Sequence, residues 1–161
     1  MAVHGLAAIR AHIDRHLPHA KAKRCCEARC ELKLDGLRCR ILLKGELARQ
    51  DRKMCDCIVF AGTDRLAVAL AELKSKTARA SDVVEKLTNG SLAALEVIGA
   101  AEGALPGLTF CFIVLAKAWH RSELVTLTRH RIAVRGTRYR ILPKKCGVSL
   151  AEVLDSAACA G

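Results

Sequence analysis

Two carboxylates and an ammonium group lie at the ends of neighbouring apolar segments of the sequence. The segment LAVALAELKS, residues 66–75, places Glu72 and Lys74 two positions apart at the end of an apolar run. Asp56 lies in the preceding apolar segment, CDCIVF. Residues two apart on a strand project to the same side, and strands joined by a tight turn are usually antiparallel neighbours. We therefore expect Asp56, Glu72 and Lys74 to lie close together.

Carboxylates and an ammonium group in this arrangement suit metal-dependent phosphate chemistry. Two carboxylates offer oxygen ligands to a hard divalent cation, Mg²⁺ or Mn²⁺, which keeps several water ligands. An ammonium group beside the ion can orient an attacking water or offset charge on a phosphate oxygen. The plain alternative is an exposed ion pair between Glu72 and Lys74, worth ~0–1 kcal/mol. The same triplet occurs as Glu31-Leu32-Lys33, where no Asp-bearing strand precedes it, so we expect no site there.

Helices and strands that could position these residues follow from the spacing of apolar side chains. Helical segments repeat apolar residues every three or four positions, and strands are alternating or continuously apolar. A continuously apolar strand such as residues 108–116 is typical of the centre of a sheet covered on both faces. In chain order we expect a helix over 5–17, a hairpin over 31–43 turning at Asp35-Gly36, strands over 55–62 and 66–75, a helix capped by Ser81 and running to residue 100, the strand over 108–116, a short helix over 122–128, a hairpin over 131–142 turning at Gly136-Thr137, and a helix announced by Ser149 and Glu152.

The segments CDCIVF with Asp56, VALAELKS with Glu72 and Lys74, and SDVVEKL after them resemble the PD-(D/E)XK nuclease superfamily, whose fold is called restriction-endonuclease-like. The resemblance covers about residues 5–116 in the order of elements. It implies an α/β fold with an α-β-β-β-α-β core and a mixed central sheet flanked by helices. It also implies that Asp56 and Glu72 bind the metal and that Lys74 assists hydrolysis of a phosphodiester.

Accessory residues can be suggested from the same resemblance. Many members of the superfamily add an acidic residue from an earlier element and a Gln or Lys on the helix after the motif. Glu46 and Lys86 are the nearest candidates, although a turn Glu and a solvated helix Lys are the commoner meanings of such residues. The sequence departs from the family motif at Cys55, which stands where the motif has its proline.

The charge of the chain indicates a polyanionic partner. The 161 residues carry 27 Lys and Arg against 16 Asp and Glu, a formal charge of +11, and an apolar fraction of 52% is ample for one core. We expect a single domain over residues 1–161, with a core over about 5–116 and a basic extension over about 117–161. Aromatic residues are only 3%, which favours phosphate contacts along duplex DNA over base stacking on single strands. The expected contacts are Arg121, Arg129, Arg131, Arg135, Arg138 and Arg140.

Nine cysteines raise the question of disulfides and metals. Nothing resembles a secretory signal, so we expect reduced thiols and a cytoplasmic protein. The apolar run over residues 110–116 is far shorter than the ~20 residues of a membrane helix. The cluster of Cys25, Cys26, Cys30 and Cys39 lacks Cys-x-x-Cys pairs, so no structural metal is expected. Cys55 and Cys57 alternate with Asp56 and are expected to be core thiols on the other side of the sheet.

Two hypotheses about function remain open at this point. The first is a Mg²⁺-dependent nuclease, with Mn²⁺ as the alternative ion, that hydrolyses phosphodiester bonds in DNA. The second is a non-catalytic basic protein on the same fold that binds nucleic acid through charge alone. The sequence leaves a homodimer open. Side chains of Asp56, Glu72 and Lys74 within reach of one ion would favour the enzyme.

Overall fold

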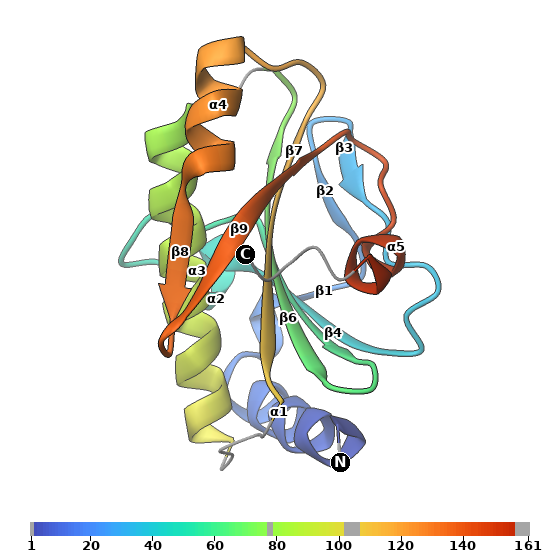
Figure 1. Ribbon diagram of the computed structural model, residues 1–161. Helices are drawn as coiled ribbons and strands as arrows, with labels where there is room; N and C mark the ends of the chain where they lie inside the picture. The colour runs from blue at the N-terminus through green and yellow to red at the C-terminus, as the bar shows by residue number, and fades with distance from the viewer. Residues whose placement is uncertain (1, 77–78, 102–106, 157–161) are drawn as a thin grey trace.

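A seven-stranded mixed sheet forms the middle of the protein (Figure 1). The computed structural model describes residues 2–76, 79–101 and 107–156. Strand pairs from β1 to β6 are antiparallel, β6–β7 and β7–β9 are parallel, and β8–β9 is antiparallel. In their order across the sheet, the strands are β1 (Lys21–Ala22), β4 (Cys39–Lys44), β5 (Cys57–Gly62), β6 (Leu66–Lys74), β7 (Thr109–Ala116), β9 (Thr137–Lys144) and β8 (Arg131–Val134).

Helices cover one face of this sheet, and a two-stranded sheet with one short helix covers the other (Figure 1). The first face carries α1 (Ala2–His16), α3 (Ala80–Ala100) and α4 (Arg121–Arg129). The second face carries β2 (Cys25–Glu27), β3 (Cys30–Leu32) and α5 (Leu150–Asp155). Two short helical turns, Pro18–Ala20 and α2 (Gly45–Ala48), connect elements at the edge. The predicted α/β class with a mixed sheet flanked by helices is confirmed.

Strand β7 is buried on both faces, as its uninterrupted apolar sequence predicts. Phe112 packs into the layer beneath the helices, and its neighbour Ile113 packs into the layer beneath β2, β3 and α5. Both side chains are fully buried. The C-terminal hairpin and the helix after it also agree with the sequence, since Ser149 accepts a hydrogen bond from the Glu152 amide at the start of α5. None of the described helices combines the length and apolar character that crossing a membrane requires.

Helix α3 runs without interruption through Asn89-Gly90 because the glycine allows close packing. A Cβ atom at Gly90 would lie 2.5 Å from the Cys55 sulfur, so no side chain fits there without movement. The prediction that Ser81 caps this helix was wrong, since Arg79 occupies the cap position without a side-chain capping bond, and the Ala80 amide at the start of the helix donates instead to the Glu123 carboxylate of α4. The close packing brings the first half of α3 against the segment that carries Asp56.

The hairpin predicted over residues 31–43 was wrong. Strand β3 pairs with β2 in the small sheet, whereas β4 pairs with β1 and β5 in the large one. The turn at Asp35-Gly36 therefore links two sheets rather than two paired strands. The other edge of β3 is occupied by the segment after β9, since the Lys33 amide donates to the Val148 carbonyl and the Leu150 amide donates to the Lys33 carbonyl.

Four cysteines form two disulfides, so the prediction of reduced thiols was wrong for them. Cys25 of β2 is bonded to Cys57 of β5, and Cys30 of β3 is bonded to Cys146 after β9. The partners are 32 and 116 residues apart, and only the packing of the small sheet on the large one brings them together. Cys57 is thus not a core thiol. Cys55 is a buried thiol, as expected, but the prediction that it shares a face with Cys57 was wrong, because Cys55 lies on the side of α3 and Cys57 on the side of β2. Because disulfides persist mainly in oxidising surroundings, the thiols no longer support a cytoplasmic location.

Candidate active site

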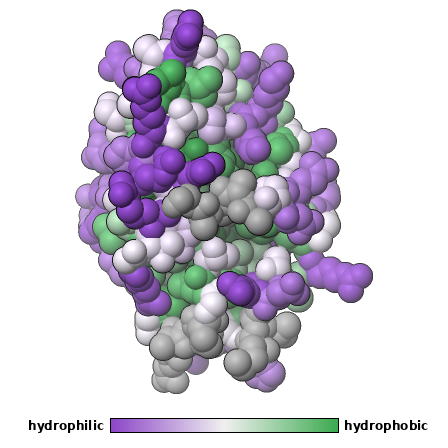
Figure 2. Space-filling model, viewed as in Figure 1, coloured by the Kyte–Doolittle hydropathy of each residue, from purple (hydrophilic) through white to green (hydrophobic). Residues whose placement is uncertain are grey.

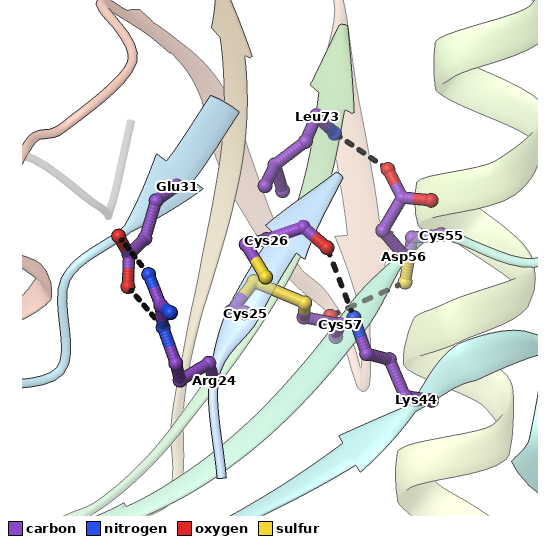
Figure 3. The surroundings of a disulfide bond; sticks show 9 residues. All are labelled: Arg24, Cys25, Cys26, Glu31, Lys44, Cys55, Asp56, Cys57 and Leu73. Atoms are coloured by element: carbon purple, nitrogen blue, oxygen red, sulfur yellow. Dashed lines mark hydrogen bonds and ion pairs between the residues drawn. A yellow bond between two sulfur atoms is a disulfide. The ribbon is translucent and has the colours of Figure 1, made fainter. Parts of the chain in front are cut away.

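Asp56, Glu72 and Leu73 meet where β5 begins and β6 ends. The two strands are antiparallel, and their register pairs Cys57 with Ala71, which puts Asp56 level with the end of β6. The Asp56 Oδ2 atom accepts a hydrogen bond of 2.7 Å from the Leu73 amide (Figure 3). The same picture shows the other carboxylate oxygen of Asp56 on the side of α3. The tight turn between the strands thus brings the two predicted acidic residues together.

Glu72 lies at the base of the site, between two lysines. Its carboxylate is 1% exposed, and its Oε1 atom lies 2.9 Å from the Lys74 Nζ and 2.9 Å from the Lys86 Nζ. Lys86 projects from α3, which packs on β6. The structure therefore joins Lys86 to the three residues of the motif. Lys74 is more accessible, with a quarter of its side chain exposed, and so lies nearer the entrance of the site than Glu72 does.

Asp82 also belongs to this cluster, and sequence reasoning missed it. It lies in the first turn of α3, and its Oδ2 atom is 3.6 Å from the Lys74 Nζ and 3.5 Å from the Lys86 Nζ. A signal was present, because Asp82 precedes Lys86 by four residues, the spacing at which a carboxylate and an ammonium meet on a helix. Asp82 thus ties Lys74 to α3 and pairs with Lys86 within the helix.

The second carboxylate oxygen of Glu72, Oε2, is buried and has no hydrogen-bond partner among the residues that the structure describes. A buried polar atom without a partner is costly, and in native proteins such an atom often marks the place of a water or an ion. Two carboxylates, one with an unpartnered oxygen, are a donor set that suits Mg²⁺ or Mn²⁺. Within the described ranges, no three His, Cys, Asp or Glu side chains are grouped so that they could hold a metal ion together. An ion here would therefore take its remaining ligands from water.

The pKa values of Asp56 and Asp82 are shifted in opposite directions. Burial and the nearby Glu72 carboxylate raise the pKa of Asp56 to about 6, against the opposing hydrogen bond from the Leu73 amide. Burial also acts to raise the pKa of Asp82, but the ammonium groups of Lys86 and Lys74 outweigh it and hold that pKa below its ordinary value. Asp56 therefore changes its charge closer to neutral pH than Asp82 does.

Glu46, the suggested accessory acid, is not joined to the cluster. Helix α2 does begin beside Asp56, because the Gly45 amide donates to the Asp56 carbonyl, at 3.0 Å. Glu46 itself is exposed, and across the described part of the chain it makes no hydrogen bond or ion pair. The backbone of α2 thus supports the site, while the Glu46 side chain faces solvent.

The basic residues predicted to bind nucleic acid lie on exposed parts of α4 and the β8–β9 hairpin. Tyr139 packs beneath the helices with Phe112, so its neighbours Arg138 and Arg140 face the opposite side of the sheet from Glu72 and its lysines. Arg131 pairs with Arg140 and shares that face, Arg135 forms the turn with φ +50°, and Arg121 and Arg129 lie at the two ends of α4. Figure 2 shows hydrophilic residues over much of the visible face, with hydrophobic residues in small separate patches.

Lysines also lie at the carboxyl edge of the parallel strands, the edge at which β6 ends with Lys74. Strands β6, β7 and β9 point the same way, and the register places Lys74, Ala116 and Lys144 at neighbouring levels of that edge. Lys117 and Lys145 follow directly and are exposed. The expected basic surface therefore includes a row of lysines that sequence reasoning did not single out.

Comparison of the chain with family models, with curated proteins and with solved structures finds no match in any of the three. The candidate site accordingly rests on the residues and geometry of this chain.

Proposed function

We propose that the protein is a Mg²⁺- or Mn²⁺-dependent nuclease that hydrolyses phosphodiester bonds, with duplex DNA as the favoured substrate. The observation that carries the proposal is the buried, unpartnered Oε2 atom of Glu72 beside Asp56. An isolated ion pair at a strand end would be exposed, whereas Glu72 is 1% exposed and in contact with two ammonium groups. A bound cation would supply the partner that this buried oxygen lacks.

Asp56 and Glu72 would hold the cation. When bound, the cation would lower the pKa of a water ligand and offset negative charge on the phosphate. Asp56 is oriented for this role by the Leu73 amide, which fixes one oxygen and leaves the other available. Glu72 is oriented by Lys74 and Lys86, which bind one oxygen and leave Oε2 available.

Lys74 would act on the substrate. Its ammonium lies between Glu72 at the base of the site and solvent at the entrance, where a phosphate would arrive. There it can donate to a phosphate oxygen or orient the attacking water. Lys86 and Asp82 would hold Lys74 and Glu72 in place from α3.

The order of elements supports a restriction-endonuclease-like core. Helix α1, strands β4, β5 and β6, helix α3 and strand β7 follow one another as in the α-β-β-β-α-β arrangement that the motif implies. The small β2–β3 sheet is an addition between α1 and β4. The formal charge of +11 supports a nucleic acid as substrate, and it equally supports the second candidate, a basic protein that binds nucleic acid without cutting it.

The test combines Mn²⁺ calorimetry with cleavage assays on a panel of duplex and single-stranded DNA and RNA. We expect the wild-type protein to bind Mn²⁺ and to cut duplex DNA, and Glu72→Gln to do neither. Glu31→Gln is the matched control, because it makes the same change in the same Glu-Leu-Lys triplet on β3. No cleavage of any substrate and no Mn²⁺ binding by the wild-type protein would leave only the non-catalytic function.

A further inference from the structure

The candidate site lies at the edge of the large sheet where β6, β7 and β9 all end. The three strands are parallel to one another, and Lys74, with a quarter of its side chain exposed, is the last residue of β6. In Figure 1 all three run upwards, and α4 begins at the top of the view after β7. Ligands of open α/β sheets bind outside the carboxyl ends of the strands. A substrate of this site would therefore approach Lys74 across this edge.

A basic residue follows the end of each of these strands. Lys76 comes two residues after β6, and Lys117 comes directly after β7. The register pairs Lys74 with Ala116, so Lys117 lies one residue beyond the neighbour of Lys74. The register between β7 and β9 puts Lys145, directly after β9, level with Ala116 on the far side of β7. Lys76, Lys117 and Lys145 are all exposed, so the three strand ends present a row of ammonium groups to solvent.

The start of α4 brings a fourth basic residue to the same edge. The Ala80 amide at the start of α3 donates to the Glu123 carboxylate in the first turn of α4, at 2.5 Å. Asp82, in the first turn of α3, pairs with Lys74 at 3.6 Å. These two contacts put the first turns of both helices beside the end of β6. Arg121, the exposed first residue of α4, therefore lies at this edge as well.

Acidic side chains do not neutralise these four residues. Glu123 is the only acid between Lys117 and Lys145, and its carboxylate is turned to the start of α3. Over the described residues, none of the four side chains makes an ion pair or a hydrogen bond. Elsewhere, basic side chains such as Arg49 and Lys53 pair with acids. Unpaired charges of one sign repel one another, and a polyanion bound across them removes that repulsion.

We propose that this edge is the surface that binds the substrate, and that its four basic residues hold phosphates of duplex DNA beside the bond to be cut. The four are Lys76, Lys117, Arg121 and Lys145, which we call the edge residues. The inference deepens the proposed function and rests on it for the class of substrate. It excludes Arg138 and Arg140 as main contacts, because they face the opposite side of the sheet from Glu72 and its lysines. Lysine and arginine contacts to phosphates position DNA without reading its sequence.

The first experiment measures binding of the full chain to a labelled DNA duplex in chelator, over a range of salt concentrations. Each phosphate contact adds about 0.9 to the slope of the logarithm of affinity against the logarithm of salt concentration. Lys117→Gln/Lys145→Gln should therefore weaken binding and lower this slope by about 2. The control, Arg138→Gln/Arg140→Gln, removes the same charge from the opposite face and should bind as the wild-type protein does. All four side chains are exposed, so these substitutions do not threaten the fold.

The outcomes of this experiment separate the inference from the proposed function. Equal losses in the two double variants would assign binding to overall charge, and an unchanged slope in Lys117→Gln/Lys145→Gln would exclude these contacts. Either result, or no binding of the duplex by the wild-type protein at low salt, would overturn the inference. The proposed function is tested separately, by cleavage in Mn²⁺. Binding through the edge residues without any cleavage would refute the proposed function and support the surface as that of a non-catalytic binding protein.

The kinetics of cleavage test the other two edge residues. Lys76→Gln/Arg121→Gln should raise KM for duplex DNA at least about tenfold and leave kcat unchanged, because contacts to flanking phosphates are the same before and during the reaction. Lys74→Ala, which removes a group beside the reacting phosphate, should instead lower kcat. A lower kcat at unchanged KM in Lys76→Gln/Arg121→Gln would place these two side chains in the chemical step and overturn their role in binding.

Discussion

The sequence Glu-Leu-Lys occurs twice in this protein, on β3 and on β6, and the two copies have different surroundings. On β3, Glu31 is a third exposed and pairs with Arg24, whose side chain is 69% exposed. On β6, Glu72 is 1% exposed, contacts two ammonium groups and keeps one oxygen without a partner. Local sequence is the same in both, so burial and the neighbouring elements decide which copy can do chemistry.

The charged residues around Glu72 come from elements that have no counterpart beside β3. Asp56 comes from the antiparallel strand before it, and Lys86 and Asp82 come from the helix after it. Strand β3 has β2 on one side and the segment after β9 on the other, and neither brings a second acid to Glu31. Predictions that separate the two triplets therefore test the site itself.

Removal of the carboxylates should give the largest difference between the triplet on β6 and the triplet on β3. Asp56→Asn and Glu72→Gln each replace a ligand oxygen that carries charge, so we expect Mn²⁺ binding and cleavage to fall at least about a hundredfold. Calorimetry and a DNA cleavage assay measure both effects. Glu31→Gln should leave both unchanged. A comparable loss in Glu31→Gln would mean that the triplet on β3, or general charge, contributes to the activity.

The second largest difference should be between Lys74 and Lys33, the lysines of the two triplets. Lys74→Ala removes the ammonium at the entrance of the site, and we expect cleavage to fall about 10²–10³-fold, the cost of losing one group that stabilises charge in the transition state. Mn²⁺ binding should persist, because both carboxylates remain. Lys33→Ala, in the other triplet, should cut DNA at the wild-type rate. Loss of Mn²⁺ binding in Lys74→Ala would show that Lys74 supports the metal ligands rather than the substrate.

The parts of this arrangement that sequence predicted are those determined by neighbouring segments. The tight turn after Gly62 fixes β5 beside β6, and the helix after β6 packs back onto it, so Asp56, Glu72, Lys74 and Lys86 could be anticipated. The parts it missed depend on distant pairing. Strand β3 joins β2 because the segment near Val148 occupies its other edge, and the Cys30–Cys146 disulfide closes over 116 residues. No local pattern encodes such contacts.

The pH dependence of metal binding should follow Asp56. Its pKa is raised to about 6 by burial and by Glu72, and the Leu73 amide and Lys86 oppose the shift. A cation binds the ionised carboxylate, so Mn²⁺ affinity should rise with pH up to about 6 and level off above it, by about tenfold per unit at the steepest. Calorimetry between pH 5 and 8 measures this. An affinity independent of pH over that interval would exclude Asp56 as a ligand.

The stability of the metal-free protein should change with pH in the opposite sense. The pKa of Asp56 is higher in the folded protein than its ordinary value of 3.8, so the folded state binds the proton more tightly than the unfolded state. The contribution of Asp56 to the free energy of unfolding is therefore greatest below about pH 4 and falls until about pH 6. Asp56→Asn should remove this dependence on pH, while its side-chain oxygen can still accept the hydrogen bond from the Leu73 amide. Thermal unfolding at each pH, in the presence of a chelator, is the measurement. An equally steep fall in Asp56→Asn would assign the dependence to other groups.

The smallest difference should be in how much the basic side chain that pairs with the glutamate of each triplet stabilises the protein. Lys86→Met leaves the buried Glu72 with Lys74 as its remaining ammonium partner, and a less compensated buried carboxylate should lower the free energy of unfolding by about 1–2 kcal/mol. Arg24→Met removes the partner of Glu31, but that carboxylate is then solvated by water, so the free energy of unfolding should stay unchanged. Denaturant unfolding of both variants in chelator makes the comparison. Equal destabilisation by Arg24→Met and Lys86→Met would show that the burial of Glu72 does not make its ion pair more important than that of Glu31. The buried oxygen of Glu72 would then no longer support a cation site.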